Sequence, residues 1–256
     1  MGSIVCIASP KGGVGKTTTA INLSAALAIS EKKTLLVDCD PMFHATTGMG
    51  IYDSKCSKTL YDVIMGYASV EESTVKSALP LLRTLPSCIE LFSAELELRS
   101  WPKNEGRLRH LLKELKDEYD YIIIDSPPSL SLLAVNAISA ADYLVIPLQC
   151  DFYALESLSP LFKTVKTLRK KADDEPKVGG VLLTMYDSGE QLARRIAEDT
   201  RKYLKDMVFQ TVIPRNIQLR ESCTHGKPVM LQDITSIGSQ SYLKLAGEVI
   251  EREWKN

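Results

Sequence analysis

The sequence is poor in the patterns that build zinc sites, disulfide frameworks and membrane spans. Its 256 residues include six cysteines and three histidines, with no C-x-x-C pair and no histidine cluster, which excludes the usual zinc and disulfide scaffolds. No apolar run approaches the roughly 18 residues that a membrane-spanning helix needs, and the first residues lack the segments of a secretory signal. These absences predict a cytosolic protein with reduced cysteines.

An excess of charge of one sign is also missing. The 31 basic residues nearly match the 32 acidic ones, and the formal net charge is −1. Any surface for nucleic acid or membrane must therefore be a local patch. With 45% hydrophobic residues the chain has enough apolar material for a large core, and we expect residues 1–256 to form a single domain.

A glycine-rich segment dominates what is present. Residues 9–18 read SPKGGVGKTT, after a short β-branched run at 4–8 and before a helical repeat of apolar residues. Glycines in such a strand-loop-helix unit let backbone N–H groups turn toward an anion, a lysine faces the β- and γ-phosphates, and a hydroxyl suits Mg²⁺. The residues assigned here to ATP are Lys11, Gly12, Gly13, Val14, Gly15, Lys16, Thr17 and Thr18.

The segment departs from the ordinary G-x-x-x-x-G-K-[ST] pattern. Pro10 stands at the position of the first glycine, and Lys11 follows it. A second lysine would only repel Lys16 unless it points at another phosphate group, so we assign it to phosphate as well. This form is the deviant Walker A motif; a glycine-rich turn without a ligand is the alternative, and the flanking strand, the helix and both lysines argue against it.

Strand and helix patterns alternate along the chain. The predicted strands are 4–8, 34–37, 89–92, 121–124, 143–146, 181–183 and 211–213. Leucine-rich helical stripes lie at 108–115 and 155–165, the second followed by a break at 173–176. This alternation predicts an α/β fold with a doubly wound, mainly parallel sheet flanked by helices. The least regular region, about 41–106, is expected to hold switch or partner-contact loops.

Acidic residues end two of the predicted strands. LLVDCDP at 35–41 carries Asp38 and Asp40, and YIIIDSPP at 121–128 carries Asp125. Open α/β sheets bind ligands at the carboxyl ends of their strands, where carboxylates organise Mg²⁺ and the attacking water. We assign Thr17, Asp40 and Asp125 to Mg²⁺, Asp125 as in a Walker B site. Aspartates that merely cap a loop are the alternative, which the phosphate loop disfavours.

Further motifs run to the end of the chain. They include KGGVGKTTTAINL at 11–23, YIIIDSPPSL at 121–130, NAISAAD at 136–142, IPLQCDFYALE at 146–156, LTMYD at 183–187, IPRN at 213–216 and HGKPV at 225–229. With these, the chain resembles the ParA/Soj-type partition ATPases of the ParA/MinD group. Only the phosphate motif is widespread among other ATPases.

The resemblance implies a Mg²⁺-dependent ATPase that forms a homodimer with ATP sandwiched between the protomers. It implies that Lys11 crosses to the partner's phosphates, where it would neutralise charge that develops during hydrolysis. Asp40 would position the hydrolytic water, so the implied catalytic residues are Lys11, Lys16 and Asp40. Pro214, Arg215 and Asn216 match the segment near the adenine.

The resemblance also implies that the ATP dimer binds DNA without sequence preference and is nucleoid-associated in the cytoplasm. A ParB-like or adaptor protein would stimulate hydrolysis, and the cargo would be a chromosome, a plasmid or another body. The basic candidates for DNA contact are Arg194, Arg195, Lys202, Arg220 and Lys244. For the helix near 191–205 the alternative is a solvated face with i,i+4 ion pairs.

Some positions depart from the family pattern. Met42, Phe43 and His44 stand where Gln-Gly-Asn is common, and Gln218 stands where an arginine is frequent; these changes bear on hydrolysis and on DNA contact. The alternative function is a MinD-like membrane-associated positioning ATPase. The acidic C-terminal stretch 243–254 argues against it, because such a helix is expected to dock on the core. A metabolic or metallocluster-assembly ATPase is a third reading, which lacks a paired-cysteine motif.

Overall fold

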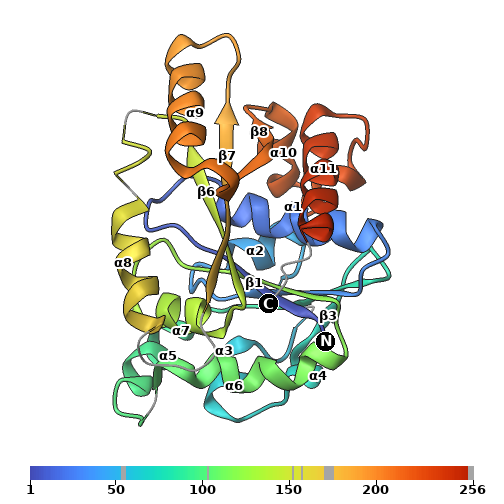
Figure 1. The fold of residues 1–256 in the computed structure, drawn as a ribbon. Helices are drawn as coiled ribbons and strands as arrows, with labels where there is room; N and C mark the ends of the chain where they lie inside the picture. The colour runs from blue at the N-terminus through green and yellow to red at the C-terminus, as the bar shows by residue number, and fades with distance from the viewer. Residues whose placement is uncertain (53–55, 103, 152, 157, 170–175, 253–256) are drawn as a thin grey trace.

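One eight-stranded sheet forms the centre of the molecule, with helices on both faces (Figure 1). The computed structural model describes residues 1–52, 56–102, 104–151, 153–156, 158–169 and 176–252. The strand order is β3-β4-β2-β5-β1-β6-β7-β8. The strands are β1 Ser3–Ile7, β2 Thr34–Asp38, β3 Val75–Lys76, β4 Leu82–Leu85, β5 Tyr121–Asp125, β6 Tyr143–Gln149, β7 Lys177–Tyr186 and β8 Val208–Pro214. All neighbouring strands are parallel except β3 and β4, which confirms the predicted doubly wound α/β sheet.

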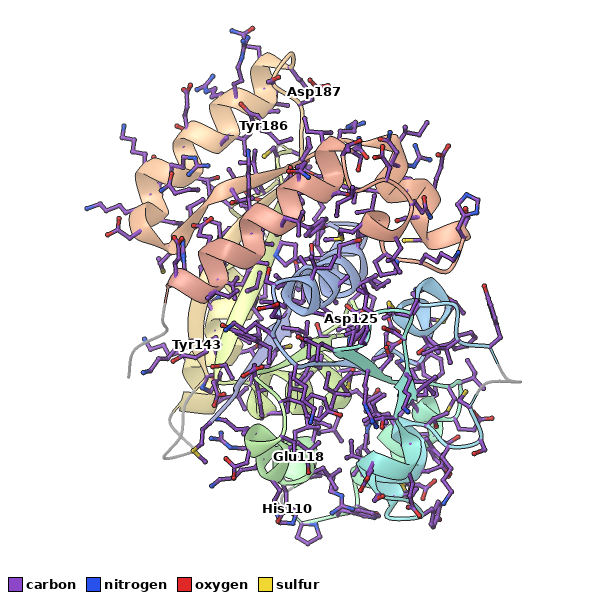
Figure 2. All side chains as sticks on the ribbon, turned by 90° about the vertical axis from the view of Figure 1, so that its right-hand side faces the viewer. His110, Glu118, Asp125, Tyr143, Tyr186 and Asp187 are labelled. Carbon is purple, nitrogen blue, oxygen red and sulfur yellow. The ribbon has the colours of Figure 1, made fainter. Side chains whose placement is uncertain are left out.

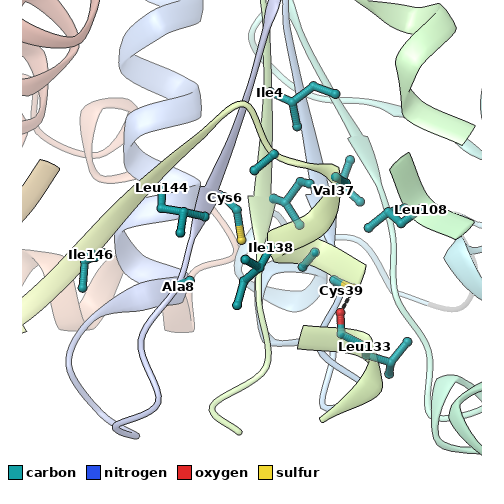
Figure 3. Packing of buried hydrophobic residues seen from close by; sticks show 14 of the residues in the cluster. Ile4, Cys6, Ala8, Val37, Cys39, Leu108, Leu133, Ile138, Leu144 and Ile146 are labelled. Atoms are coloured by element: carbon teal, nitrogen blue, oxygen red, sulfur yellow. Dashed lines mark hydrogen bonds between the residues drawn. The ribbon is translucent and has the colours of Figure 1, made fainter. Parts of the chain in front are cut away.

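The helices pack on the two faces of the sheet and form one core layer with each face. They are α1 Lys16–Ile29, α2 His44–Gly48, α3 Leu60–Met65, α4 Val70–Ser73, α5 Leu91–Leu98, α6 Arg107–Lys113, α7 Leu132–Ala140, α8 Leu158–Arg169, α9 Gln191–Leu204, α10 Ile217–Thr224 and α11 Ile237–Glu251. Along β1, Ile4 and Cys6 belong to the cluster that includes α3 and α5 to α9, whereas Val5 and Ile7 belong to the one that includes α1, α10 and α11. Figure 3 shows Ile4 and Cys6 with residues of α6 and α7. Alternate side chains of a strand point to opposite faces, so a central strand covered by helices on both faces is apolar throughout.

Six of the seven predicted strands are confirmed, and the one at 89–92 is wrong. Residues 91–98 form α5, whose Leu91, Ala94 and Leu98 are fully buried at helical spacing. The strand next to β2 is instead β4, at Leu82–Leu85. The short run at 89–92 fits either period, and the leucines and glutamates that follow it favour a helix.

The region 41–106 is more regular than its sequence indicates. It holds α2, α3, α4, β3, β4 and α5, each too short to show a clear period on its own. The helix predicted from the stripe at 155–165 is α8, which begins at Leu158. Of the predicted break at 173–176, residues 173–175 lie outside the described residues.

Charged side chains take the backbone hydrogen bonds of the outermost strand β8. The Glu248 carboxylate accepts from the N–H groups of Gln210 and Thr211 at 2.8 and 3.0 Å. The guanidinium groups of Arg201 and Arg252 donate to carbonyl oxygens of the same strand at 3.1 to 3.2 Å. The register between β7 and β8 shifts along this stretch, so these groups depend on side chains for partners.

Two glycines let α2 and α10 approach each other. Gly50 and Gly226 have φ of 67° and 60°, and a Cβ on Gly226 would lie 2.7 Å from the Cα of Gly50. Both the backbone conformation and the lack of space therefore require glycine at this contact.

Gly226→Ala should lower the free energy of unfolding by about 2–4 kcal/mol, because it adds left-handed strain to a steric overlap. Urea denaturation measures the change. Gly247→Ala is the matched control: its Cβ would meet nothing within 4 Å in the interior of α11, so it should stabilise the protein by about 0.5–1 kcal/mol. Equal stability of the two variants would contradict the tight contact.

Candidate nucleotide-binding site

The loop between β1 and α1 has the backbone of a phosphate cradle. Gly13 and Gly15 have φ of 74° and 89°, and a Cβ at either would meet nothing within 4 Å, so this side of the loop is open. The Lys16 side chain is buried and its Nζ donates to the carbonyl oxygen of Lys11 at 3.1 Å. Helix α1 starts at Lys16 and directs its N-terminal dipole toward the loop. An anion seated here would meet backbone N–H groups, a helix N-terminus and a buried cation.

Three buried aspartates lie at the same edge of the sheet. Asp38 at the end of β2 is in register with Asp125 at the end of β5, and Asp40 follows two residues later. All three are buried, and Figure 2 shows Asp125 in the middle of the molecule. Burial, together with the neighbouring Asp38, raises the pKa of Asp125 well above its usual value. Burial lowers the pKa of Lys16, an effect that Asp125 and Asp40 oppose.

Asp125 shows that these residues fit a divalent cation. Neither of its carboxylate oxygens has a hydrogen bond of normal geometry within the described part of the chain, although buried polar groups normally find one. The Thr17 hydroxyl only partly offsets the effect of burial on the pKa of Asp125. The Thr17 hydroxyl is on the first turn of α1, beside the loop. Mg²⁺ is commonly held by one or two protein ligands plus phosphates and water, and Thr17 and Asp125 are of the right chemistry for such ligands.

A cavity of about 450 Å³ opens beside the phosphate loop. It is lined by Gly13, Gly15 and Thr18 of the loop and α1, and by Pro214, Arg215 and Asn216, the segment assigned to adenine. The geometry thus brings the two ends of the predicted ATP site together. The remaining lining residues were not predicted as ATP ligands: Gln149, Thr184, Met185, Ile213, Leu219, Arg220, Cys223 and Tyr242. Of these, Thr184 and Met185 belong to the LTMYD motif, which could have pointed to this side of the cavity.

Several contacts fix the walls of this cavity. Thr184 Oγ1 donates to the carbonyl oxygen of Val14 at 2.9 Å, which ties β7 to the phosphate loop. The hydroxyls of Thr19 and Tyr242 are 3.1 Å apart and join α1 to α11. Met185 has a φ of 51°, a left-handed conformation that is strained for a side chain of this size. The walls of the cavity are therefore tied together by contacts of β7 with the phosphate loop and of α1 with α11.

Lys11 pairs within its own chain. Its Nζ forms a charge-assisted hydrogen bond with the carboxylate of Asp151, just after β6, and the two side chains are 31% and 32% exposed. Asp151 lies inside the IPLQCDFYALE motif, but nothing in the sequence alone links it to a lysine 140 residues away.

The candidate DNA contacts are exposed residues on three helices. Arg194, Arg195 and Lys202 are on α9, Arg220 is on α10 and Lys244 is on α11. Arg195 lies 4.0 Å from Asp199 one turn later, as the ion-pair alternative for this helix predicts. Arg220 also lines the 450 Å³ cavity. The neighbouring basic residue Arg201 is used within the fold, on β8.

Comparison with known proteins identifies the family. A family model described as an AAA domain matches residues 2–178. The chain is 46% identical to the chromosome partitioning protein ParA of Myxococcus xanthus, over 99% of this chain and 89% of that protein. The chain belongs to the ParA/Soj family of partition ATPases. The sporulation initiation inhibitor protein Soj of Bacillus subtilis is also 46% identical, over 97% of this chain and 98% of that relative.

The fold is also similar to that of a protein whose structure was solved with a bound nucleotide. The structure of cobyrinic acid a,c-diamide synthase from Mycobacterium smegmatis, with bound ADP and magnesium, has a TM-score of 0.85 and 29% identity, and covers 100% of this chain and 96% of that one. The sequence identity to the ParA and Soj relatives, 46%, is much higher than the 29% identity to this synthase. The resemblance to the ParA/Soj family is therefore confirmed, and a metabolic ATPase is not favoured.

The helices of the structure bear on the MinD-like, membrane-associated alternative. Among the residues that the structure describes, no helix has the length and apolar character to cross a bilayer. In the last helix, α11, Tyr242, Leu245, Ala246 and Val249 are buried in the core. The apolar side of this helix is therefore packed against the sheet, as its acidic character predicts.

Removing the buried charge of Asp125 should stabilise the nucleotide-free protein at neutral pH. An aspartate whose pKa is raised by folding contributes stability that is present below its unfolded pKa of about 4 and is lost as the pH rises through its folded pKa. Asp125→Asn escapes that loss, so at pH 8 and without Mg²⁺ we expect a gain of about 1–2 kcal/mol that vanishes near pH 4.

Thermal unfolding of the two proteins between pH 4 and pH 8 measures this difference. Asp206→Asn, at an exposed position after α9, is the control and should leave the pH profile unchanged. A variant that is less stable than the native protein at pH 8 would contradict the absence of a partner for the Asp125 carboxylate.

Proposed function

We propose that this partition ATPase is an ATP-dependent dimerising switch that binds DNA without sequence preference and segregates or positions a chromosome, plasmid or other cargo. ATP and Mg²⁺ are its cofactors. The observation that carries the proposal is the buried, unpartnered Asp125 carboxylate beside an open glycine cradle and a buried lysine. We further propose that residues 1–256 work as a single domain.

In this proposal the residues of the edge divide phosphate binding, cation binding and water positioning among them. Backbone N–H groups of 12–16 and the Lys16 ammonium bind the phosphates, and Thr17 and Asp125 hold Mg²⁺, with Asp40 as a further candidate ligand. The bound cation supplies charge neutralisation on the phosphate oxygens. Asp40 orients the attacking water, and the 450 Å³ cavity with Pro214, Arg215 and Asn216 takes the base. The phosphates would thus lie between the cation-binding carboxylates and the loop.

Lys11 adds a condition for dimer formation. For Lys11 to reach the phosphates of a partner protomer, its ion pair with Asp151 in the same chain must open. Partly exposed ion pairs contribute about 1 kcal/mol or less, so this contact would weaken dimerisation without preventing it. ATP bound in both protomers supplies the competing negative charge.

The DNA-bound state would use the exposed arginines and lysines of α9, α10 and α11. A ParB-like or adaptor protein would stimulate hydrolysis and dissolve the dimer. The MinD-like alternative, a membrane-associated positioning ATPase, would need an apolar anchor, and the described part of α11 spends its apolar side on the core.

Asp40→Ala should retain ATP and stay dimeric, because it loses the group that orients water. Its binding to mixed-sequence duplex DNA, measured by fluorescence anisotropy at one moderate salt concentration, should be tight in ATP and weak in ADP. Replacing Arg194, Arg195 and Lys202 together by alanine should reduce the slope of log affinity against log salt by about 3. Lys113→Ala on α6 is the exposed control.

If Asp40→Ala dimerises in ATP but binds DNA in neither nucleotide, the proposal that this protein binds DNA is wrong. Flotation of the same dimer with anionic liposomes then tests the membrane alternative directly. Binding to liposomes and not to DNA would favour the MinD-like function.

Asp151→Asn should make ATP-dependent dimerisation easier, since it frees Lys11 in both protomers. We expect the dimer dissociation constant in ATP to fall about 2- to 20-fold, the range for losing two weak ion pairs. Sedimentation velocity measures it. Asp199→Asn, which removes the carboxylate near Arg195 on α9, is the matched control and should have no effect. Weaker dimerisation of Asp151→Asn would argue that Asp151 supports the dimer instead.

A further inference from the structure

Four polar residues form a closed hydrogen-bonded ring around the backbone of Asp40. They are Asp38 at the end of β2, Asp40 itself, Thr46 on α2 and Ser87, two residues after β4. All four are buried, with exposed fractions between 0% and 6%.

The ring can be followed bond by bond from Asp38. Its Oδ2 accepts from the N–H and from the hydroxyl of Thr46, both at 2.7 Å. The Thr46 Oγ1 in turn accepts from the Ser87 N–H at 2.9 Å. The Ser87 hydroxyl donates to the carbonyl oxygen of Asp40 at 2.6 Å. The Asp40 N–H returns to Asp38 Oδ1 at 3.1 Å, which closes the ring.

Both backbone polar groups of Asp40 are therefore held by side chains from other positions. A buried loop residue without such contacts could rotate about its φ and ψ, and its carboxylate would move with it. The Asp40 C=O accepts from the Phe43 N–H of its own loop at 2.8 Å, and the Ser87 hydroxyl adds a hydrogen bond from a segment that follows another strand. Together with the bond to its N–H, these contacts restrict this rotation. The carboxylate is also engaged locally, because its Oδ1 accepts from the Met42 N–H at 3.0 Å.

We propose that Ser87 is a positioning residue for ATP hydrolysis, acting through Asp40. The proposal rests on the proposed function, in which Asp40 orients the attacking water. Ser87 lies 47 residues from Asp40 in sequence and is the ring member that joins β4 to the end of β2. Its hydroxyl fixes where the Asp40 carboxylate lies, and Ser87 is not among the residues that line the 450 Å³ cavity proposed for the nucleotide.

The Ser87 hydroxyl should affect the rate of hydrolysis and not the affinity for ATP. A misplacement of about 1 Å in a group that orients a reactant can lower the rate up to about a hundredfold. In the proposed function the phosphates are held by the loop at 11–18, between β1 and the first turn of α1. Among the described residues, the hydrogen bonds of Ser87 go to Thr46 and Asp40 and not to this loop. Loss of the Ser87 hydroxyl should therefore reduce kcat and leave ATP affinity unchanged.

The experiment compares Ser87→Ala, Ser87→Thr and Ser73→Ala in the full-length protein. Ser73→Ala is the matched control, because Ser73 is 2% exposed and its hydroxyl donates to a backbone carbonyl oxygen at 2.9 Å on α4, outside the ring. Fluorescent-nucleotide titration gives the ATP dissociation constant, and phosphate release at saturating ATP gives kcat. Thermal unfolding checks that the variants are folded.

We expect Ser87→Ala to lower kcat about 10- to 100-fold with an ATP dissociation constant within about twofold of the native protein. Ser87→Thr keeps the donor, and a cavity of about 690 Å³ lined by Thr46 and Ser87 offers room for its methyl group, so it should restore kcat to within about threefold. Ser73→Ala should keep the native kcat. Native kcat in Ser87→Ala, or no recovery in Ser87→Thr, would overturn the proposal.

A double-mutant cycle shows whether Ser87 acts through Asp40. If it does, Ser87→Ala should cost nothing further in an Asp40→Ala background, since groups that act as one unit are not additive. A second loss of about tenfold would mean that Ser87 acts elsewhere. Normal hydrolysis by Asp40→Ala alone would overturn the role of Asp40 in the proposed function and the ring proposal with it. An inactive Asp40→Ala beside a fully active Ser87→Ala would overturn the ring proposal only.

Discussion

The excess of buried negative charge at the carboxyl edge of the sheet is the constraint on which the site depends. Asp38, Asp40 and Asp125 are buried there beside a single buried lysine, Lys16. The two in-register carboxylates differ in their hydrogen bonds. Asp38 accepts three, and burial raises its pKa only to about 6. Asp125 accepts none of normal geometry from the described residues. An uncompensated buried carboxylate is unfavourable, and a divalent cation brought by a nucleotide is the counter-charge that this edge lacks.

The strand order makes this arrangement possible. β5 lies between β1 and β2, so the ends of β2 and β5 lie beside the loop that leaves β1. The cavity proposed for the adenine lies on the other side of β1, and its lining includes Thr184 and Met185 of β7, Pro214 of β8, and Arg215 and Asn216 after it. A nucleotide bound across the edge would therefore connect two halves of the sheet whose helices pack in both core layers, which relates ligand occupancy to the whole fold.

The sequence predicted the parts of the site whose chemistry is local. The phosphate loop, Asp40 and Asp125 each sit in a contiguous motif beside a strong strand pattern, and the structure brings them together with Pro214, Arg215 and Asn216 near one edge. Asp151 and Ser87 were missed because their partners, Lys11 and Asp40, are 140 and 47 residues away, and no local pattern encodes such a pairing. The strand at 89–92 failed for a related reason: its short apolar run has no period of its own, and packing of α5 against α3 decided its structure.

The side chains that occupy β8 also determine how two copies can meet. An open sheet edge with free N–H and C=O groups invites strand addition from another chain, the first step of many aggregates. Here Glu248, Arg201 and Arg252 occupy those groups on β8, and the opposite edge, β3, is only two residues long. Copies of this chain therefore have little means of joining backbone to backbone into a permanent, extended sheet. If copies associate, as in the proposed dimer, the contact would therefore be made by side chains and by a ligand held between the protomers.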